Sequence, residues 1–172
     1  MQNDLCQDLR RKHKVERILA PMKQLITAFV AVDAPVFFVC FSLSADDEQF
    51  RRFGDRYCIE GTDGARVIPE LIPFARNIVH KRKHSAFFET DLDARLRAKG
   101  VLDVYLTGLQ TQICIMTTAA DASFRGYHPV AVSDCVVSTR DEKRDQALDW
   151  IARYVGDVRK SDAVLGELMD DR

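Results

Sequence analysis

Cys114 stands between an apolar, β-branched segment and a run of small residues, an arrangement suited to building a nucleophilic thiolate. Residues 101–107 are typical of a buried parallel strand, Gly108 breaks it, and residues 117–122 are typical of a close-packed helix that stops at Gly126. Cys114 is therefore expected in or just before the first helical turn, where free amides and the helix dipole stabilise a thiolate or an oxyanion. The alternative is that Cys114 is a small buried hydrophobe, as most free cysteines are.

Lys81 is the second candidate for chemistry. It follows a short apolar strand expected at residues 77–80. In an open parallel sheet the carboxyl ends of the strands meet on one side, so the Lys81 ammonium is expected to share a crevice with the Cys114 thiol and to stabilise its charged form. The alternative is a solvated basic run over residues 80–84, which is too short to indicate a nucleic-acid patch.

Helical and strand patterns alternate along the chain, as in βαβ units. This predicts an α/β fold with an open, mostly parallel, doubly wound sheet and helices on both faces. Helices are expected at residues 15–32, from a capping box at residues 90–93 to Gly100, and at residues 141–154 and 161–169. Strands are expected at residues 35–42, 77–80, 101–107, 129–133 and 157–159, and residues 45–73 form a polar excursion with a short apolar piece.

Composition limits the function classes. The 172 residues suit a single domain, residues 1–172, and 25 basic against 26 acidic side chains give no field that points to nucleic acid or to a membrane surface. No apolar run approaches the roughly 20 residues that cross a bilayer, and residues 1–14 are too charged for a signal peptide. The five cysteines show no zinc-site spacing, Cys40 and Cys135 suit core packing, and the odd count favours a reducing cytoplasm.

Several segments, taken in order, resemble the isochorismatase-like cysteine hydrolases, a superfamily that includes nicotinamidases, N-carbamoylsarcosine and ureidoacrylate amidohydrolases, and isochorismatase. The segments are residues 1–5, residues 57–65, Lys81 with residues 85–88 and 90–92, and residues 108–122 with Gly126 and Tyr127. The resemblance runs through nearly the whole chain. It implies a three-layer α/β/α fold, Cys114 as the nucleophile and Lys81 as the catalytic lysine.

The resemblance also implies a non-proline cis peptide between Leu109 and Gln110. In the family, this bond aims the backbone amide of the Gln110 position, together with that of Cys114, at the substrate carbonyl oxygen. These two amides are therefore the expected oxyanion hole.

One part of the family pattern is absent from this sequence. The family's third catalytic residue is an Asp at the end of the first strand, immediately before the segment that begins here at Met1. The resemblance places that strand in the middle of the sheet, so without it two inner edges and apolar helix faces are expected to be exposed. Asp4 matches a different family position. A wrong or truncated start is the favoured explanation, and a degenerate copy is the alternative.

The expected reaction is cleavage of a C–N bond in a small amide or ureide through a thioester on Cys114, with Phe41, Phe87 and Phe88 walling the pocket or packing in the core. The nicotinamidase branch holds a metal through an Asp-x-His cluster, and residues 41–48 contain no His, so no metal and no other cofactor is expected. The alternatives are a vinyl ether hydrolase of the isochorismatase type, a catalytically dead binding or scaffold member, and a thiol redox protein. The expected partners are a small-molecule substrate and further copies in a homodimer or homotetramer.

Overall fold

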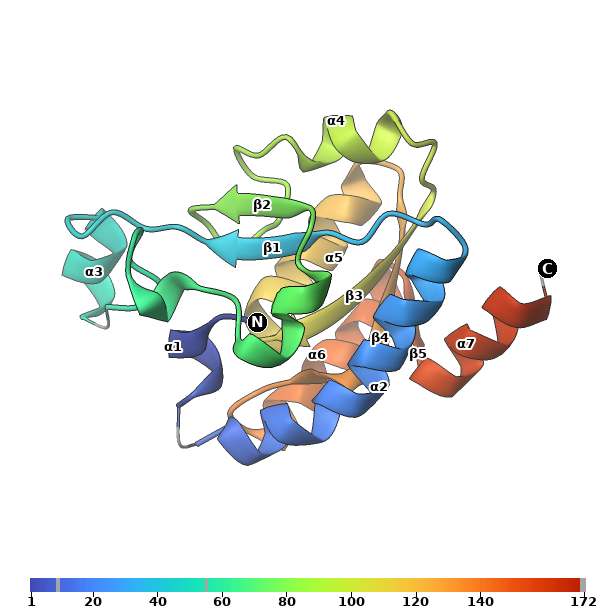
Figure 1. The fold of residues 1–172 in the computed structure, drawn as a ribbon, viewed down its shortest axis with the longest axis horizontal. Helices are drawn as coiled ribbons and strands as arrows, with labels where there is room; N and C mark the ends of the chain where they lie inside the picture. The colour runs from blue at the N-terminus through green and yellow to red at the C-terminus, as the bar shows by residue number, and fades with distance from the viewer. Residues whose placement is uncertain (9, 55, 171–172) are drawn as a thin grey trace.

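The strands form two separate parallel groups in the computed structural model, which describes residues 1–8, 10–54 and 56–170 (Figure 1). β1 (Phe38–Phe41) pairs with β2 (Ile78–Lys81). β4 (His128–Val137) lies between β3 (Asp103–Leu109) and β5 (Asp157–Arg159). All of these pairings are parallel, which confirms the predicted α/β fold class.

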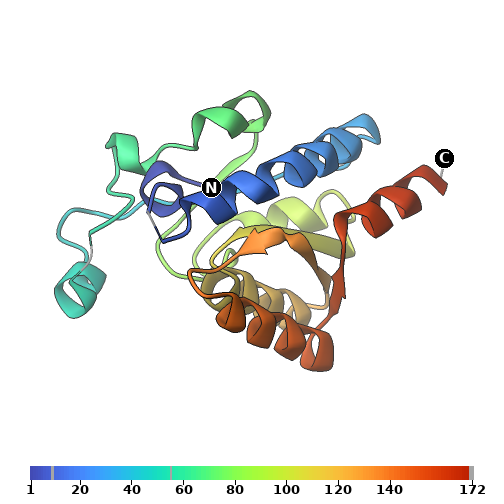
Figure 2. The same cartoon turned by 90° about the horizontal axis from the view of Figure 1, so that it is seen from below.

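Helices cover both faces of the three-stranded sheet. α2 (Lys12–Ala31) and α7 (Ser161–Asp170) lie on one face, and α5 (Met116–Phe124) and α6 (Asp141–Tyr154) lie on the other (Figure 2). α4 (Leu92–Arg97) packs with residues of β1 and β2. The arrangement is a three-layer sandwich.

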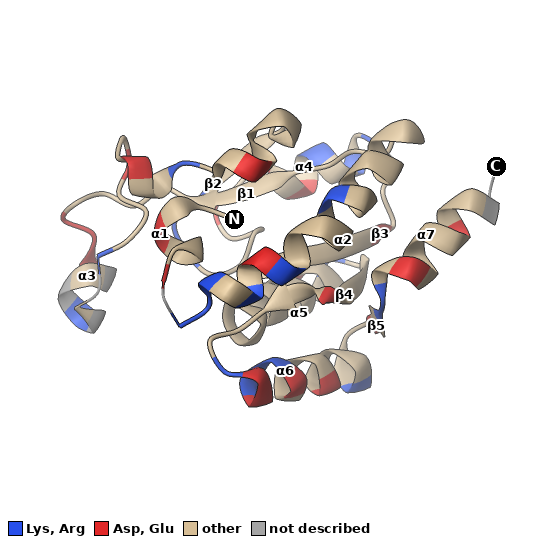
Figure 3. Ribbon diagram, turned by 60° about the horizontal axis from the view of Figure 1, so that its bottom comes forward, with Lys and Arg blue, Asp and Glu red and all other residues tan. Residues whose placement is uncertain are grey.

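The amphipathic pattern of α2 explains its position. Its buried side chains recur every three or four residues and are Val15, Ile18, Met22, Leu25 and Ile26. They join one apolar core with Cys40 of β1 and Cys135 of β4. On the outer surfaces of α2 and α6, acidic and basic residues are interspersed, in keeping with the near-zero net charge (Figure 3). No helix in the described ranges is long and apolar enough to cross a membrane.

The remaining elements are short. α1 (Asn3–Cys6), α3 (Glu48–Phe53), η1 (Asp63–Ala65), η2 (Pro69–Phe74) and η3 (Thr111–Ile115) are single turns or little more. Three of them, α3, η1 and η2, form the excursion expected at residues 45–73, so the apolar piece expected there is largely a 3₁₀ helix.

Two local expectations are corrected. The amide of Leu92 contacts Thr90 Oγ1 at 3.4 Å, but the carboxylate of Asp93 does not reach back to complete a capping box. It accepts a hydrogen bond from the Tyr127 hydroxyl at 2.7 Å instead. β4 also continues past Ser133 to Val137, because the sequence after Asp134 is apolar and fully buried, and a register shift opposite residues 106–108 of β3 restores the pairing.

A slot separates the two groups of strands. Within the described part of the chain, no ladder joins β1 to β3, and both strands line a cavity of about 450 Å³. The N-terminus lies between the two groups, and Met1 contributes to the cavity wall (Figure 1). β1 and β3 are thus each paired on one side only among the described strands.

The side chain of Gln2 covers part of the exposed edge of β1. Its Oε1 accepts the backbone N–H of Phe41 at 2.8 Å, and its Nε2 donates to the Phe41 carbonyl at 2.7 Å. Nε2 also donates to the carbonyl of Ala65 at 2.7 Å. The carboxamide therefore occupies the place that a peptide group of a neighbouring strand would take.

Candidate active site

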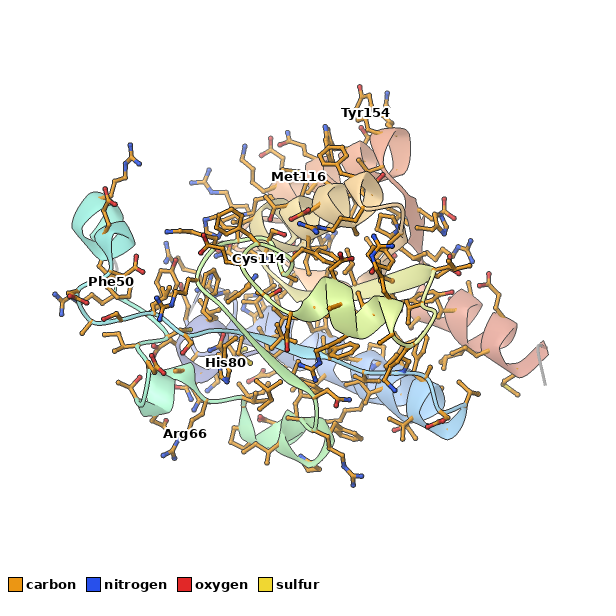
Figure 4. All side chains as sticks on the ribbon, turned by 90° about the horizontal axis from the view of Figure 1, so that it is seen from above. Phe50, Arg66, His80, Cys114, Met116 and Tyr154 are labelled. Carbon is orange, nitrogen blue, oxygen red and sulfur yellow. The ribbon has the colours of Figure 1, made fainter. Side chains whose placement is uncertain are left out.

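Cys114 lies between a strand and a helix, as expected. Cys114 belongs to η3, which follows the end of β3. α5 begins at Met116, two residues after Cys114 (Figure 4). Cys114 is the one partly exposed cysteine of the described chain, since Cys6, Cys40, Cys58 and Cys135 are all buried. The π-type turn of η3 was not predicted. It closes on the carbonyl of Gln110, which accepts N–H groups from Ile113 at 3.1 Å and Ile115 at 3.2 Å.

The peptide between Leu109 and Gln110 is cis, which confirms that expectation. A side-chain network fixes the loop that follows. Gln112 Nε2 donates to Gln110 Oε1 at 3.0 Å, and the hydroxyls of Ser138 and Thr139 donate to the two glutamine Oε1 atoms. The segment after β4 thus holds the loop from which the Cys114 thiol projects.

Lys81 reaches the same site from the end of β2. Its side chain is only 5% exposed, and Nζ donates to the His84 carbonyl at 2.5 Å and lies 4.7 Å from the centroid of the Phe41 ring. Burial lowers the pKa of Lys81, and the neighbouring Cys114 sulfur opposes this shift. Within the described residues, Lys81 has no ion pair with a carboxylate. Lys81 and Cys114 both line the slot, so the structure brings together the two residues that the sequence singled out.

His84 is a site residue that the sequence analysis missed. Its Nδ1 lies 4.0 Å from Cys114 Sγ, and its ring meets Phe41 edge to face with centroids 5.9 Å apart. Partial burial, together with the charges of Lys81 and Lys83, lowers the pKa of His84. In the sequence His84 belongs to a basic run, and only its position shortly after Lys81 hinted that the chain turns back towards the thiol.

The three candidate pocket phenylalanines have different surroundings. Phe41 is buried beside Lys81 and His84. Phe87 is buried, stacks on Tyr127 and lines the slot. Phe88 is 46% exposed and is not part of the slot wall.

The described residues contain no group of three or more His, Cys, Asp or Glu side chains placed to hold a metal ion. The carboxylate of Asp4 is engaged elsewhere, since its Oδ2 accepts the backbone N–H of Cys58 at 2.7 Å. It therefore binds the polar excursion rather than the thiol of Cys114.

Comparison with known proteins identifies the family. The isochorismatase domain model matches residues 1–163. The uncharacterized isochorismatase family protein YwoC of Bacillus subtilis is 32% identical over 107 residues, 62% of this chain and 57% of YwoC. The matched region thus spans little more than half of that relative.

Solved structures agree in fold. N-carbamoylsarcosine amidase from Thermoplasma acidophilum superposes with a TM-score of 0.78 at 34% identity, over 87% of this chain and 85% of that one. A cysteine hydrolase from Pseudomonas syringae gives a TM-score of 0.89 at 25% identity, over 100% and 90% of the two chains. Since the family model covers almost the entire sequence, this chain belongs to the isochorismatase family.

Proposed function

We propose that this chain is a cysteine hydrolase that cleaves the C–N bond of a small amide or ureide through a thioester on Cys114. The observation that carries the proposal is the meeting of a partly exposed thiol with a buried lysine at one cavity. Names of similar proteins support the chemistry, because one is an amidase and another a cysteine hydrolase.

In the proposed reaction, the Cys114 thiolate attacks the substrate carbonyl carbon and the π electrons move to the carbonyl oxygen. The backbone amides of Gln110 and Cys114 hold the resulting oxyanion. The proton that leaves the thiol is transferred to the nitrogen, so collapse of the intermediate breaks the C–N bond, expels ammonia or an amine and leaves a thioester. Water then cleaves the thioester to a carboxylic acid, and one of its protons restores the thiol. The Lys81 ammonium stabilises negative charge beside the sulfur in both steps.

We further propose a substrate pocket next to Phe87, which lines the slot, and Phe41, which is buried beside Lys81. Two such rings favour a compact substrate with an apolar part. We also propose that the chain forms a homodimer or homotetramer and acts in the cytoplasm. Light scattering of the purified protein measures the assembly, and a monomer at micromolar concentration would contradict that part.

Ammonia release from a panel of small amides and ureides tests the function. The chain is expected to turn over at least one member, Cys114→Ala to lose turnover, and Cys6→Ala, which removes a buried thiol in α1, to keep it. Turnover that persists in Cys114→Ala would overturn the thioester mechanism.

A binding or scaffold role is the second candidate. It is favoured by one observation, namely that the described residues give neither Cys114 nor Lys81 a carboxylate partner. A folded protein that binds amides in calorimetry but releases no ammonia would establish this role.

A further inference from the structure

We propose that Ser85 and Asp121 form a positioning pair, which holds the turn after β2 (residues 82–87) against α5. The pair acts through Lys81, whose ammonium it keeps beside the Cys114 thiol. The part of this inference that concerns turnover rests on the proposed function. The part that concerns the thiol does not, because alkylation of the sulfur needs no substrate.

The bond between Ser85 and Asp121 joins two elements that are distant in sequence. Ser85 Oγ donates to Asp121 Oδ2 at 2.6 Å, across 36 positions of the chain. The other carboxylate oxygen, Oδ1, accepts a hydrogen bond from Arg125 Nε at 2.8 Å, so the orientation of the carboxylate is fixed from both sides. A short hydrogen bond from a hydroxyl to a carboxylate is stronger than one between neutral groups.

Thr118 makes a second contact between the same two elements. Its Oγ1 accepts the backbone N–H of Ala86 at 3.1 Å. Thr118 lies three residues before Asp121 on α5, so both side chains lie on one face of the helix. Ser85 Oγ also accepts the backbone N–H of Phe87 at 3.1 Å. The turn is therefore held both internally and against α5.

The contacts form a closed ring of residues around the active site. The carbonyl of His84, the residue before Ser85, accepts a hydrogen bond from Lys81 Nζ at 2.5 Å. The Lys81 ammonium interacts in turn with the Cys114 sulfur. Cys114 stands two residues before α5, the helix that carries Asp121 (Figure 4). The bond between Ser85 and Asp121 thus joins the support of the lysine to the helix that follows the thiol.

Lys81 depends on such support because its ammonium is buried. The side chain is 5% exposed, and the described residues give it no carboxylate partner. A flexible side chain with a charged end keeps one geometry only where fixed acceptors define it. The His84 carbonyl is such an acceptor, and the bond of the adjacent Ser85 to α5 sets its position. A displaced turn would weaken the attraction between the ammonium and a thiolate.

Alkylation of Cys114 by iodoacetamide, followed by peptide mass spectrometry, measures how strongly the site stabilises the thiolate. In Ser85→Ala the pH profile of the rate should move to higher pH, so that the rate at pH 7 falls by about three- to tenfold while the plateau at high pH is kept. Ser123→Ala is the matched control. It is the same substitution on α5, at a hydroxyl that makes no hydrogen bond among the described residues, and it should keep the parent profile.

Three further variants distinguish the bond from the side chains that make it. Ser85→Thr keeps a hydroxyl and should restore most of the parent profile. Asp121→Ala removes the acceptor, and it replaces Ser85→Ala as the test if that variant does not fold. The double variant Ser85→Ala/Asp121→Ala should shift the profile no further than Asp121→Ala alone, because each single variant already breaks the same bond. Additive shifts would contradict the pairing.

The outcomes separate this inference from the proposed function. A parent-like profile in Ser85→Ala, with the fold intact by circular dichroism, overturns the positioning role even if the chain hydrolyses amides. An equal loss of rate at every pH overturns it as well, because it reports altered access to the sulfur. A shifted profile without ammonia release from any substrate supports the pair and refutes only the hydrolase proposal. If both hold, kcat for Ser85→Ala should fall by about tenfold with little change in KM.

Discussion

At the scale of single residues, burial decides which cysteine is available for chemistry. Burial raises the pKa of Cys58 and of Cys135 to about 12, whereas Cys114 is partly exposed beside Lys81 and His84. A protonated, buried thiol is inert towards electrophiles. Five cysteines in the sequence thus reduce to one candidate nucleophile once the fold is known.

Lys81→Met should separate catalysis from stability. Methionine has nearly the same volume but no charge, so kcat/KM for amide hydrolysis should fall by about 10²-fold as the charge beside the thiolate is lost. The unfolding free energy in urea should change by only about 1 kcal/mol, because removal of a desolvated ammonium without a carboxylate partner offsets the loss of its hydrogen bond to the His84 carbonyl.

Lys83→Met is the control for Lys81→Met, because Lys83 is an exposed neighbour in the same turn. Lys83→Met should leave both kcat/KM and the unfolding free energy unchanged. Equal kcat/KM values for the parent protein and Lys81→Met would rule out a catalytic role for the lysine.

The buried thiols also predict how stability depends on pH. Cys135 has a folded-state pKa of about 12 against an ordinary 9.0, so between these values the unfolded chain binds fewer protons and stability falls as pH rises. Urea denaturation at pH 8 and pH 10 measures the resulting loss of unfolding free energy. In Cys135→Ala the loss over this interval should be smaller by about 1 kcal/mol, and an equal loss in both proteins would contradict the prediction.

Among the elements, those with strong local signals matched the sequence prediction closely. α6 occupies residues 141–154 and β5 occupies residues 157–159, as expected, because charged residues open the helix and Gly156 separates the two. α2 also agrees to within a few residues, since its apolar stripe is regular.

Other elements depend on tertiary contacts that a single sequence does not carry. The π-type turn of η3 forms where the loop after β3 is held by Ser138 and Thr139, and the extension of β4 depends on a register shift against β3. His84 was missed for the same reason, because nothing local distinguishes it from His80. The sequence identified Cys114 and Lys81 because each follows an expected strand and because both match catalytic positions of the family that the chain resembles.

Gln2 links the N-terminal segment to β1, and Gln2→Ala tests that link. The substitution leaves the N–H and C=O of Phe41 without their buried partner, which should cost about 1–3 kcal/mol of unfolding free energy. Urea denaturation gives the value. Gln7→Ala, at an exposed position just after α1, is the matched control, and equal denaturation midpoints for the two variants would show that the carboxamide is not needed.

For the molecule as a whole, the slot between the two groups of strands is the feature that is expected to lower the unfolding free energy most. At about 24 cal/mol per Å³ of unfilled apolar volume, a dry cavity of about 450 Å³ would cost on the order of 10 kcal/mol. That is comparable with the entire stability of a typical domain. The slot is therefore expected to contain water or to be filled by apolar groups. The unpaired edges of β1 and β3 beside it can also pair with a further strand.

Amide hydrogen exchange, resolved by residue with NMR, reports directly on those edges. In a parallel strand successive N–H groups point to opposite sides, so β3, which pairs with β4 alone among the described strands, should alternate between slow and fast exchange. β4 is the internal control, because β3 and β5 flank it and its central amides should be protected without interruption. Uninterrupted protection along β3 would mean that its free edge is covered in solution, and dilution of the sample would then show whether a second copy of the chain provides the cover.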